Sequence, residues 1–363
     1  MHALQLDTDC EGPLALNDNA FELCRDIILP DGARFFQQVR RYDNCLADVL
    51  QRPGYLAGDT LKLILPFLKA QGLTNERLRD FSRKNIMLVP GVAGAYKFLH
   101  AQGFPIFEIS ASYRQFAEVV GKKLGFSPKN IFCTELDLDR FSLSPVEAEE
   151  LLRLQQEIAA APEIELPPGA GALEDLPEPV RDAVKLCDRI FGERIPEMDI
   201  GVIYREVNPV GGPEKARALE ESLARTGLTM ADVIYVGDSI TDVQAFEAVR
   251  AGGGLGLSFN GNRYAVKAAE VSIIADNAWP VALVASVFRL WGKEGVMELA
   301  TKGAAGASRY LVLPEAVIEI LMRGLQGRNF NLYSTAARDP EMIAQESTAM
   351  RAKLWGSSVA ALG

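Results

Sequence analysis

The sequence is poor in the side chains from which many active sites and metal centres are built. Its 363 residues include only two histidines, His2 and His100, so a histidine-rich metal centre or a Ser-His-Asp triad has almost no material. The five cysteines are scattered and form no CxxC pair, which argues against a zinc site or a disulfide framework. Such cysteine usage is typical of a reducing compartment, and we expect a cytoplasmic protein.

An excess of basic charge and a long apolar run are also missing. The formal net charge is -10 and the sequence pI is about 5.0, which disfavours broad binding to nucleic acid or to anionic membranes. The longest apolar run, near residues 278–291, is shorter than a membrane span and contains Arg289. The N-terminus carries no signal-peptide pattern. We therefore expect neither nucleic acid nor a membrane as a partner, and the oligomeric state is not readable.

The stretch VIYVGDSITD, residues 233–242, is the most informative part of the chain. Its apolar run has the length of a buried strand, and a helical pattern begins near Ile240. Asp238 lies in the turn between the two and Asp242 lies near the start of the helix, at the strand end where parallel α/β sheets place their ligands. Two neighbouring carboxylates repel each other, and a divalent cation would remove the repulsion. The alternative is that both aspartates merely favour the start of the helix.

A similar arrangement is expected at the N-terminus, in MHALQLDTDCEGPL. The apolar residues around Leu4 and Leu6 indicate a first strand, which ends in an acidic turn that contains Asp7, Asp9 and Glu11. A strand that ends in three acids is unusual for a purely structural element, although a solvated turn has the same composition.

Two further polar residues flank predicted strands. Ser110 follows a predicted strand at 105–109, where it is either a ligand-binding residue or a helix N-cap. Lys215 lies in the first turn of a helix that begins after Gly211-Gly212-Pro213. A cation at this helix end is unfavourable unless it meets an anion, or unless Lys215 is a surface lysine whose stem covers apolar neighbours.

The patterns divide the chain into a core and two insertions and predict an α/β fold with a parallel sheet. The predicted core comprises residues 1–14, 86–140 and 197–292. Residues 15–85 form a helical cap, and residues 141–196 form a second, mostly helical insertion with a Pro/Gly-rich loop. We expect a helical C-terminal extension at 293–363. Strands are expected within these core segments, at 130–139, 200–206, 255–259 and 271–274.

Taken in chain order, the polar positions resemble the haloacid dehalogenase-like superfamily of phosphohydrolases. The segment GDSITD matches the GDxxxD motif of that superfamily, and GGPEKARAL resembles its lysine motif. The segment PGVAGAYKFLHAQGFPIFEIS resembles the approach to the second motif in enzymes of the phosphoserine phosphatase type. The resemblance implies a three-layer, Rossmann-like parallel sheet with a mainly helical cap.

The first motif of the superfamily, DxDGT, fits this sequence in two registers. In one, Asp7 is the nucleophile and Asp9 is the acid/base, but Cys10-Glu11 stands in place of Gly-Thr. In the other, TDCEGPL aligns with TDxDGTL, so that Asp9 is the nucleophile and Glu11 the second acid. The DCEGP pattern resembles a group of phosphatase-like proteins of archaea and bacteria. We favour the second register, because Gly12 then meets the backbone requirement of the turn.

The resemblance implies a mechanism for the second register. Asp9 attacks phosphorus and forms an aspartyl-phosphate, and Glu11 protonates the leaving oxygen and later deprotonates water. Mg²⁺ is held by the Asp9 carboxylate, the backbone carbonyl of Glu11 and Asp238, with support from Asp242.

The resemblance further implies that Ser110 and Lys215 hold the phosphoryl oxygens. We therefore expect a Mg²⁺-dependent phosphatase that acts on a small phosphorylated metabolite. On the predicted cap, Arg34, Arg40 and Arg41 are candidates for contacts with the substrate, although a solvated helix face has the same appearance.

Two other functions stay open from the sequence. A phosphomutase would use the same carboxylates. A binding or assembly subunit that keeps the fold but catalyses weakly is favoured by the atypical first motif, because Glu11 is longer than the usual aspartate and catalytic geometry tolerates little displacement.

Overall fold

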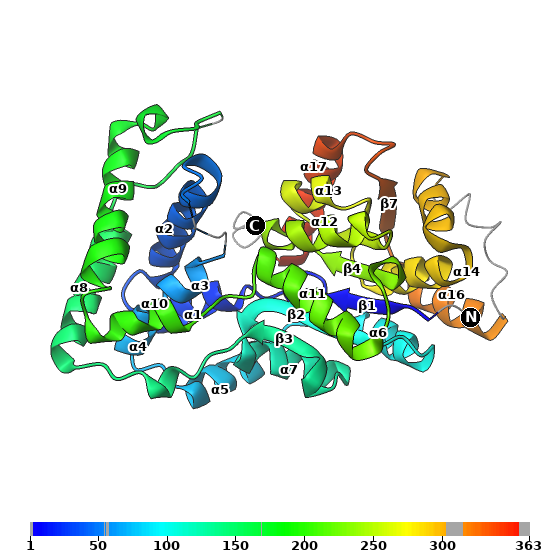
Figure 1. Ribbon diagram of the computed structural model, residues 1–363, viewed down its shortest axis with the longest axis horizontal. Helices are drawn as coiled ribbons and strands as arrows, with labels where there is room; N and C mark the ends of the chain where they lie inside the picture. The colour runs from blue at the N-terminus through cyan, green and yellow to red at the C-terminus, as the bar shows by residue number, and fades with distance from the viewer. Residues whose placement is uncertain (1–2, 54, 56–57, 168, 303–314, 356–363) are drawn as a thin grey trace.

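The computed structural model of the chain describes residues 3–53, 55, 58–167, 169–302 and 315–355. A seven-stranded sheet, of order β3-β2-β1-β4-β5-β6-β7, lies at its centre (Figure 1). All neighbouring strands are parallel except β6 and β7. The strands are β1 (Gln5–Thr8), β2 (Ile106–Tyr113), β3 (Ile131–Thr134), β4 (Val233–Gly237), β5 (Leu255–Phe259), β6 (Val271–Ala275) and β7 (Phe330–Ser334).

Helices cover both faces of the sheet because its central strands are apolar on both sides. In β4, Ile234 and Val236 pack with helices α6, α7 and α14, whereas Val233 and Tyr235 face α11, α12 and α13. These core helices are α6 (Val92–Ala101), α7 (Arg114–Leu124), α11 (Pro213–Thr226), α12 (Val243–Ala251), α13 (Arg263–Ala268) and α14 (Trp279–Lys302). The predicted three-layer α/β fold is confirmed.

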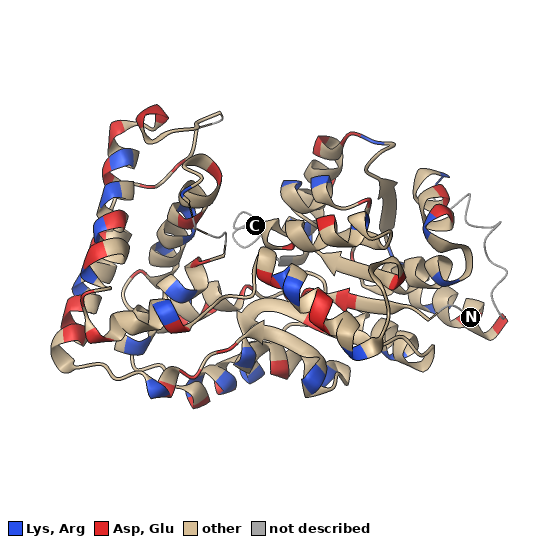
Figure 2. Ribbon diagram, viewed as in Figure 1, with Lys and Arg blue, Asp and Glu red and all other residues tan. Residues whose placement is uncertain are grey.

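The cap lies beside the sheet, at the carboxyl ends of its parallel strands (Figure 1). Its helices come from both insertions and share one apolar cluster, so the two insertions pack as one body. Charged residues of both signs are spread along its outer helices α8 and α9 (Figure 2). Its helices are α1 (Asn19–Ile27), α2 (Gly32–Asn44), α3 (Thr60–Leu63), α4 (Leu65–Ala70), α5 (Asn75–Asn85), α8 (Pro145–Ala160), α9 (Glu178–Arg189) and α10 (Ile203–Glu206).

Short 3-10 and π segments join these elements. The 3-10 segments are η2 (Pro128–Asn130), η3 (Leu138–Arg140), η4 (Leu173–Asp175), η6 (Asp199–Val202), η7 (Met230–Asp232) and η8 (Ile240–Asp242). The π segments are η1 (Cys45–Val49) and η5 (Ile190–Arg194), each directly after a cap helix. Across the described residues, no helix is both long enough and apolar enough to cross a membrane.

The strand predicted at 200–206 is wrong. This segment forms the 3-10 turn η6 and the short helix α10 within the cap. Ile200 and Ile203 are buried there in the apolar cluster of the cap. Their three-residue spacing suits a helical face, and a short apolar run does not by itself distinguish a strand from a buried helix.

The helical prediction for the C-terminal segment is also wrong in part. Between α16 (Glu315–Leu325) and α17 (Pro340–Trp355), the strand β7 pairs antiparallel with β6 and adds an edge to the sheet. The strand β7 therefore belongs to the core sheet. The parts of the predicted extension at 303–314 and 356–363 lie outside the described residues.

Candidate active site

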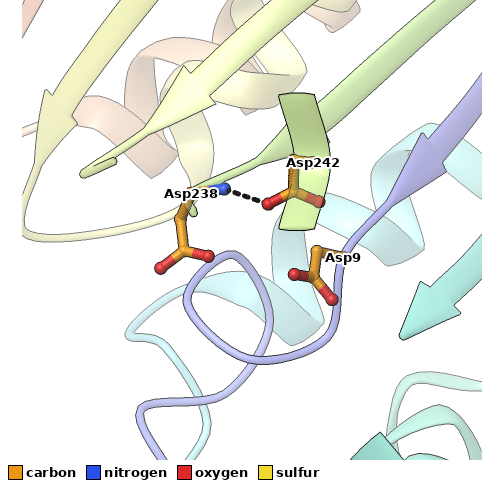
Figure 3. A group of neighbouring side chains, drawn as sticks. All are labelled: Asp9, Asp238 and Asp242. Carbon is orange, nitrogen blue, oxygen red and sulfur yellow. Dashed lines mark hydrogen bonds between the residues drawn. The ribbon is translucent and has the colours of Figure 1, made fainter. Parts of the chain in front are cut away.

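Three buried aspartates meet where β1 and β4 end side by side (Figure 3). The register pairs Thr8 with Val236, so the residues that follow both strands enter the same space. Asp9 comes directly after β1, and Asp238 comes directly after β4. Asp242 reaches back from the end of η8. One carboxylate oxygen of each aspartate lies within 4.8 Å of one from each of the others.

Lys215 is the cation of this cluster. It lies in the first turn of α11, and its side chain is fully buried. Its Nζ is 2.6 Å from Oδ2 of Asp9 and 2.6 Å from Oδ1 of Asp242. Burial acts to lower the pKa of Lys215, but Asp242 and Asp9 outweigh it and raise the pKa above the usual value. The lysine predicted from its unfavourable place at a helix N-terminus therefore lies between two carboxylates.

Asp242 is held by hydrogen bonds to both of its carboxylate oxygens. The Tyr235 hydroxyl donates to Oδ1 at 2.6 Å, on the same oxygen that faces Lys215. The backbone N–H of Asp238 donates to Oδ2 at 3.0 Å (Figure 3). The backbone N–H of Ser239 donates to the same oxygen at 2.9 Å. These contacts fix the turn after β4, so Asp242 sets the position of Asp238.

Burial raises the pKa of both Asp9 and Asp238 above the usual value of an aspartate. Burial raises the pKa of Asp9 to about 8, with Lys215 opposing the shift and Asp242 adding to it. Burial also raises the pKa of Asp238 to about 6, opposed by Arg351. Two buried carboxylates that face one space are the oxygen donors that a hard divalent cation prefers, so the residues fit Mg²⁺.

Glu11 and Gly12 form the turn after Asp9. The Glu11 carboxylate accepts a hydrogen bond of 2.7 Å from the backbone N–H of Asn19, at the start of cap helix α1. Burial and the charge of Asp18 raise the pKa of Glu11 well above its usual value. Gly12 has a φ of 95°, a conformation that favours glycine. The Gly12 turn brings its backbone against Asp238.

Asp7 lies apart from this cluster. It belongs to β1 and is buried within the sheet, where the Ser222 hydroxyl of α11 donates to its Oδ2 at 2.7 Å. The Gln5 amide donates to both carboxylate oxygens at 2.9 Å. Both aspartates contact α11, but Asp7 lies within β1 beside Ser222, whereas Asp9 follows the end of the strand beside Lys215. The structure thus places Asp9, and not Asp7, beside Lys215 and Asp238.

A cavity of about 180 Å³ opens above the aspartates, between the core and the cap. Its core side includes Asp9, Asp238 and Thr241, and its cap side includes Phe36 and Arg40. Arg40 is paired with Asp18 at 2.6 Å.

The other two arginines proposed for the cap lie elsewhere. Arg34 donates to the carbonyl of Ala161, and Arg41 pairs with Glu163. Neither is among the described residues that line the cavity.

Ser110 is buried inside β2, which continues to Tyr113 past an irregular pairing with β3. Its hydroxyl accepts a hydrogen bond from the backbone N–H of Ser112 at 3.0 Å. Ala111, rather than Ser110, is among the described residues that line the cavity. A role of Ser110 in phosphate binding stays a prediction.

Sequence reasoning missed Arg351. It lies on α17 and lines the cavity, with Nη1 3.1 Å from Oδ2 of Asp238. No local pattern could have identified it, because an arginine on a C-terminal helix is ordinarily a surface residue.

No protein-family model matches this chain, and no curated protein matches it. Among solved structures, a gene product of Archaeoglobus fulgidus is 29% identical with a TM-score of 0.76, and the match covers 98% of this chain and 97% of that chain. This similarity extends over both the core and the cap.

Phosphoserine phosphatase structures match less closely. One in the apo form is 12% identical with a TM-score of 0.43, and the match covers 75% of this chain and 93% of that chain. A HAD family hydrolase from Deinococcus radiodurans R1 is 12% identical with a TM-score of 0.30, covering 71% of this chain and 80% of that chain.

Proposed function

We propose that this chain is a phosphohydrolase of the haloacid dehalogenase-like superfamily that cleaves a small phosphomonoester through an intermediate on Asp9. The observation that carries the proposal is the position of Asp9. Its carboxylate lies at the end of a central parallel strand, beside Lys215 and Asp238, and it lines the cavity between core and cap.

Asp9 is the nucleophile in this proposal. One of its carboxylate oxygens attacks phosphorus, the bond from phosphorus to the leaving oxygen breaks, and an aspartyl-phosphate forms. Water then attacks that phosphorus, releases phosphate and regenerates the carboxylate. Lys215 keeps Asp9 oriented, and its charge offsets the negative charge that gathers when a phosphoryl group approaches three carboxylates.

Glu11 is the proposed proton carrier. Burial and the charge of Asp18 raise the pKa of Glu11 well above its usual value, which is the direction that a general acid requires. Glu11 would donate that proton to the leaving oxygen and later take one from the attacking water. The hydrogen bond from Asn19 N–H holds the longer side chain of Glu11 against the cap, which compensates for the replacement of the usual aspartate.

Mg²⁺ would be held by Asp9, Asp238 and the backbone carbonyl of Glu11. When bound, it would neutralise charge on the phosphoryl oxygens. Asp242 would keep Asp238 in place through the backbone hydrogen bonds of the turn.

The cap supports a small substrate. Its residues, including Phe36, Arg40 and Leu61, line the cavity together with the core and leave about 180 Å³ above Asp9. A space of this size suits a metabolite rather than a folded phosphoprotein.

All five cysteines are free and buried, which agrees with our proposal of a cytoplasmic enzyme.

The test is phosphate release from an aryl phosphate, with and without Mg²⁺, by the wild type, Asp9→Asn and Asp7→Asn. We expect Mg²⁺-dependent release that is lost in Asp9→Asn and largely kept in Asp7→Asn. Asp7→Asn is a matched control, because it removes a buried carboxylate of the same strand outside the cavity. Loss only in Asp7→Asn would reverse the assignment of the nucleophile. No release by any of the three would favour the binding or assembly subunit.

A further inference from the structure

A second cavity, of about 530 Å³, lies between the cap helix α5 and the core helix α7. The two helices pack side by side at the lower edge of the molecule in the view of Figure 1. The described residues that line this α5–α7 groove are all different from those that line the cavity above Asp9. A volume of this size falls within the range of small-molecule sites.

The α5–α7 groove is basic, although the net charge of the chain is -10. Among its described lining residues, Glu118 is the one acid, and Arg114 pairs with it at 3.2 Å from outside the groove. Basic residues lie along both helices (Figure 2). The groove itself is lined by Arg79 and Arg83 of α5 and by Lys122 and Lys123 of α7.

The positive charge of the groove is largely unneutralised by the protein. Arg83 pairs with Asp80 at 3.2 Å, but both side chains are at least half exposed, and such pairs contribute little. The other three basic residues make no ion pair within the part of the chain that the structure describes. Lys122 lies in the last turn of α7, where the helix dipole also favours a cation. Arg79 lies in the middle of α5 and is half-buried, so the dipole does not explain it.

Gln115 adds a hydrogen-bonding group to the groove. It is 4% exposed, and its Nε2 donates to the carbonyl of Leu136 at 2.8 Å. This bond fixes the orientation of the amide, because a flipped amide would bring two carbonyl oxygens together. The Oε1 of Gln115 is buried and has no hydrogen-bond partner among the described residues, which is unfavourable. A ligand that donates a hydrogen bond would satisfy it.

The groove ends at a joint between core and cap. Nε2 of Gln115 lies 3.3 Å from Oδ1 of Asn75, the first residue of α5. The same oxygen accepts a hydrogen bond of 2.8 Å from the backbone N–H of Leu138. Leu136 and Leu138 belong to the segment that leads from β3 to the cap helix α8. A ligand in the groove would therefore contact a cap helix and a core helix at once.

We propose that the α5–α7 groove is a binding site for a small phosphate ester that carries hydroxyl groups, such as a phosphorylated sugar. The basic residues bind the phosphate oxygens, and a hydroxyl of the ligand donates to Oε1 of Gln115. The ligand bridges α5 and α7 and so holds this side of the cap against the core. The site is separate from the cavity above Asp9, and the proposal does not rest on the function proposed there.

The test is titration calorimetry on the full chain with ribose 5-phosphate, without divalent metal. We expect Arg79→Met and Lys122→Met each to weaken binding roughly three- to tenfold, as for the loss of one partly exposed charged contact. The double variant should lose more than either single variant. Ethyl phosphate has the same charge and no hydroxyl group, so it should bind roughly three- to tenfold more weakly than ribose 5-phosphate.

Lys84→Met is the matched control. Lys84 is an exposed residue of α5 that is not among the described residues lining the groove. Its substitution removes the same charge from the protein and should change the affinity less than about twofold. Circular dichroism verifies that each variant folds. Hydrogen exchange should slow in α5 and α7 of the wild type when ribose 5-phosphate is added, and should not slow in Arg79→Met/Lys122→Met.

Four outcomes would overturn the proposal. The first is no binding of ribose 5-phosphate, or equal binding by the wild type and the double variant. The second is an equal loss in Arg79→Met and Lys84→Met, which would show a general effect of net charge. The third is equal affinity for ethyl phosphate and ribose 5-phosphate, which would remove the role of the ligand hydroxyl. The fourth is tighter binding of an oligoglutamate peptide, which would show a docking face for an acidic protein segment.

Discussion

Gly12 and Asp238 lie so close together that a β-carbon on residue 12 would be 2.4 Å from Cγ of Asp238. The first-motif turn and the turn after β4 are therefore built against each other. Glycine meets two requirements here, because its φ is 95° and because it leaves room for the carboxylate.

Gly12→Ala should displace Asp238 and weaken Mg²⁺ binding by about tenfold or more. Backbone strain alone would cost about 1–2 kcal/mol of unfolding free energy at a positive φ. Gly103→Ala is the matched control, because Gly103 has a φ of 77° and nothing within 4 Å of an added β-carbon. Calorimetry and urea unfolding should show similar strain in both variants but loss of Mg²⁺ affinity in Gly12→Ala alone. Equal Mg²⁺ affinities would contradict the close approach.

Lys215→Met should destabilise the fold by about 3–5 kcal/mol, because it leaves Asp9 and Asp242 buried without their shared cation. Urea unfolding without metal measures this loss. Lys267→Met removes the exposed pair with Glu341 and should cost less than about 1 kcal/mol. If the two variants lost similar free energy, the buried pairs would not contribute as described.

The stability of the wild type should fall relative to that of Asp7→Asn as pH rises. Burial raises the pKa of Asp7 from 3.8 to about 7, against hydrogen bonds from Ser222 and Gln5. A raised native pKa means that the folded state binds the proton more tightly, so this stabilisation is complete below pH 3.8 and is lost as pH rises through about 7.

Between pH 5 and pH 8 the difference in unfolding free energy between wild type and Asp7→Asn should therefore change by roughly 3 kcal/mol. Urea unfolding of both proteins at each pH gives this difference, in which the other titrating groups largely cancel. A wild type that gains stability over Asp7→Asn as pH rises would show that Asp7 is charged in the native state.

Glu11→Gln should affect poor leaving groups more than good ones. An alkyl phosphate needs a proton on its leaving oxygen, so kcat/KM should fall by about a hundredfold or more. A nitrophenyl phosphate leaves as a stable anion, so its kcat/KM should fall much less. The ratio kcat/KM reports steps up to aspartyl-phosphate formation, which separates this role from the activation of water. Equal losses on both substrates would refute a general acid at Glu11.

Several features of the site followed from the sequence because they are encoded locally. Asp9 and Asp238 each directly follow an apolar strand, and parallel strands bring their carboxyl ends to one edge. Lys215 stands out by its unfavourable position at a helix N-terminus, and Gly12 favours the register that places Asp9 in the cluster. A strand, its end and a helix start are each determined within a few residues. Asp7, two residues before Asp9, lies inside β1, where Gln5 and Ser222 hold it outside the cavity.

The remaining features were decided by the tertiary structure. Residues 200–206 have the apolar content of a strand, but the packing of Ile200 and Ile203 in the cap makes them helical. Arg351 carries no local signal, and only the pairing of β7 with β6 and the docking of α17 bring it to Asp238. Local propensity acts over a few residues, whereas these placements depend on which distant surfaces bury one another, and that is settled by the packing of the whole chain.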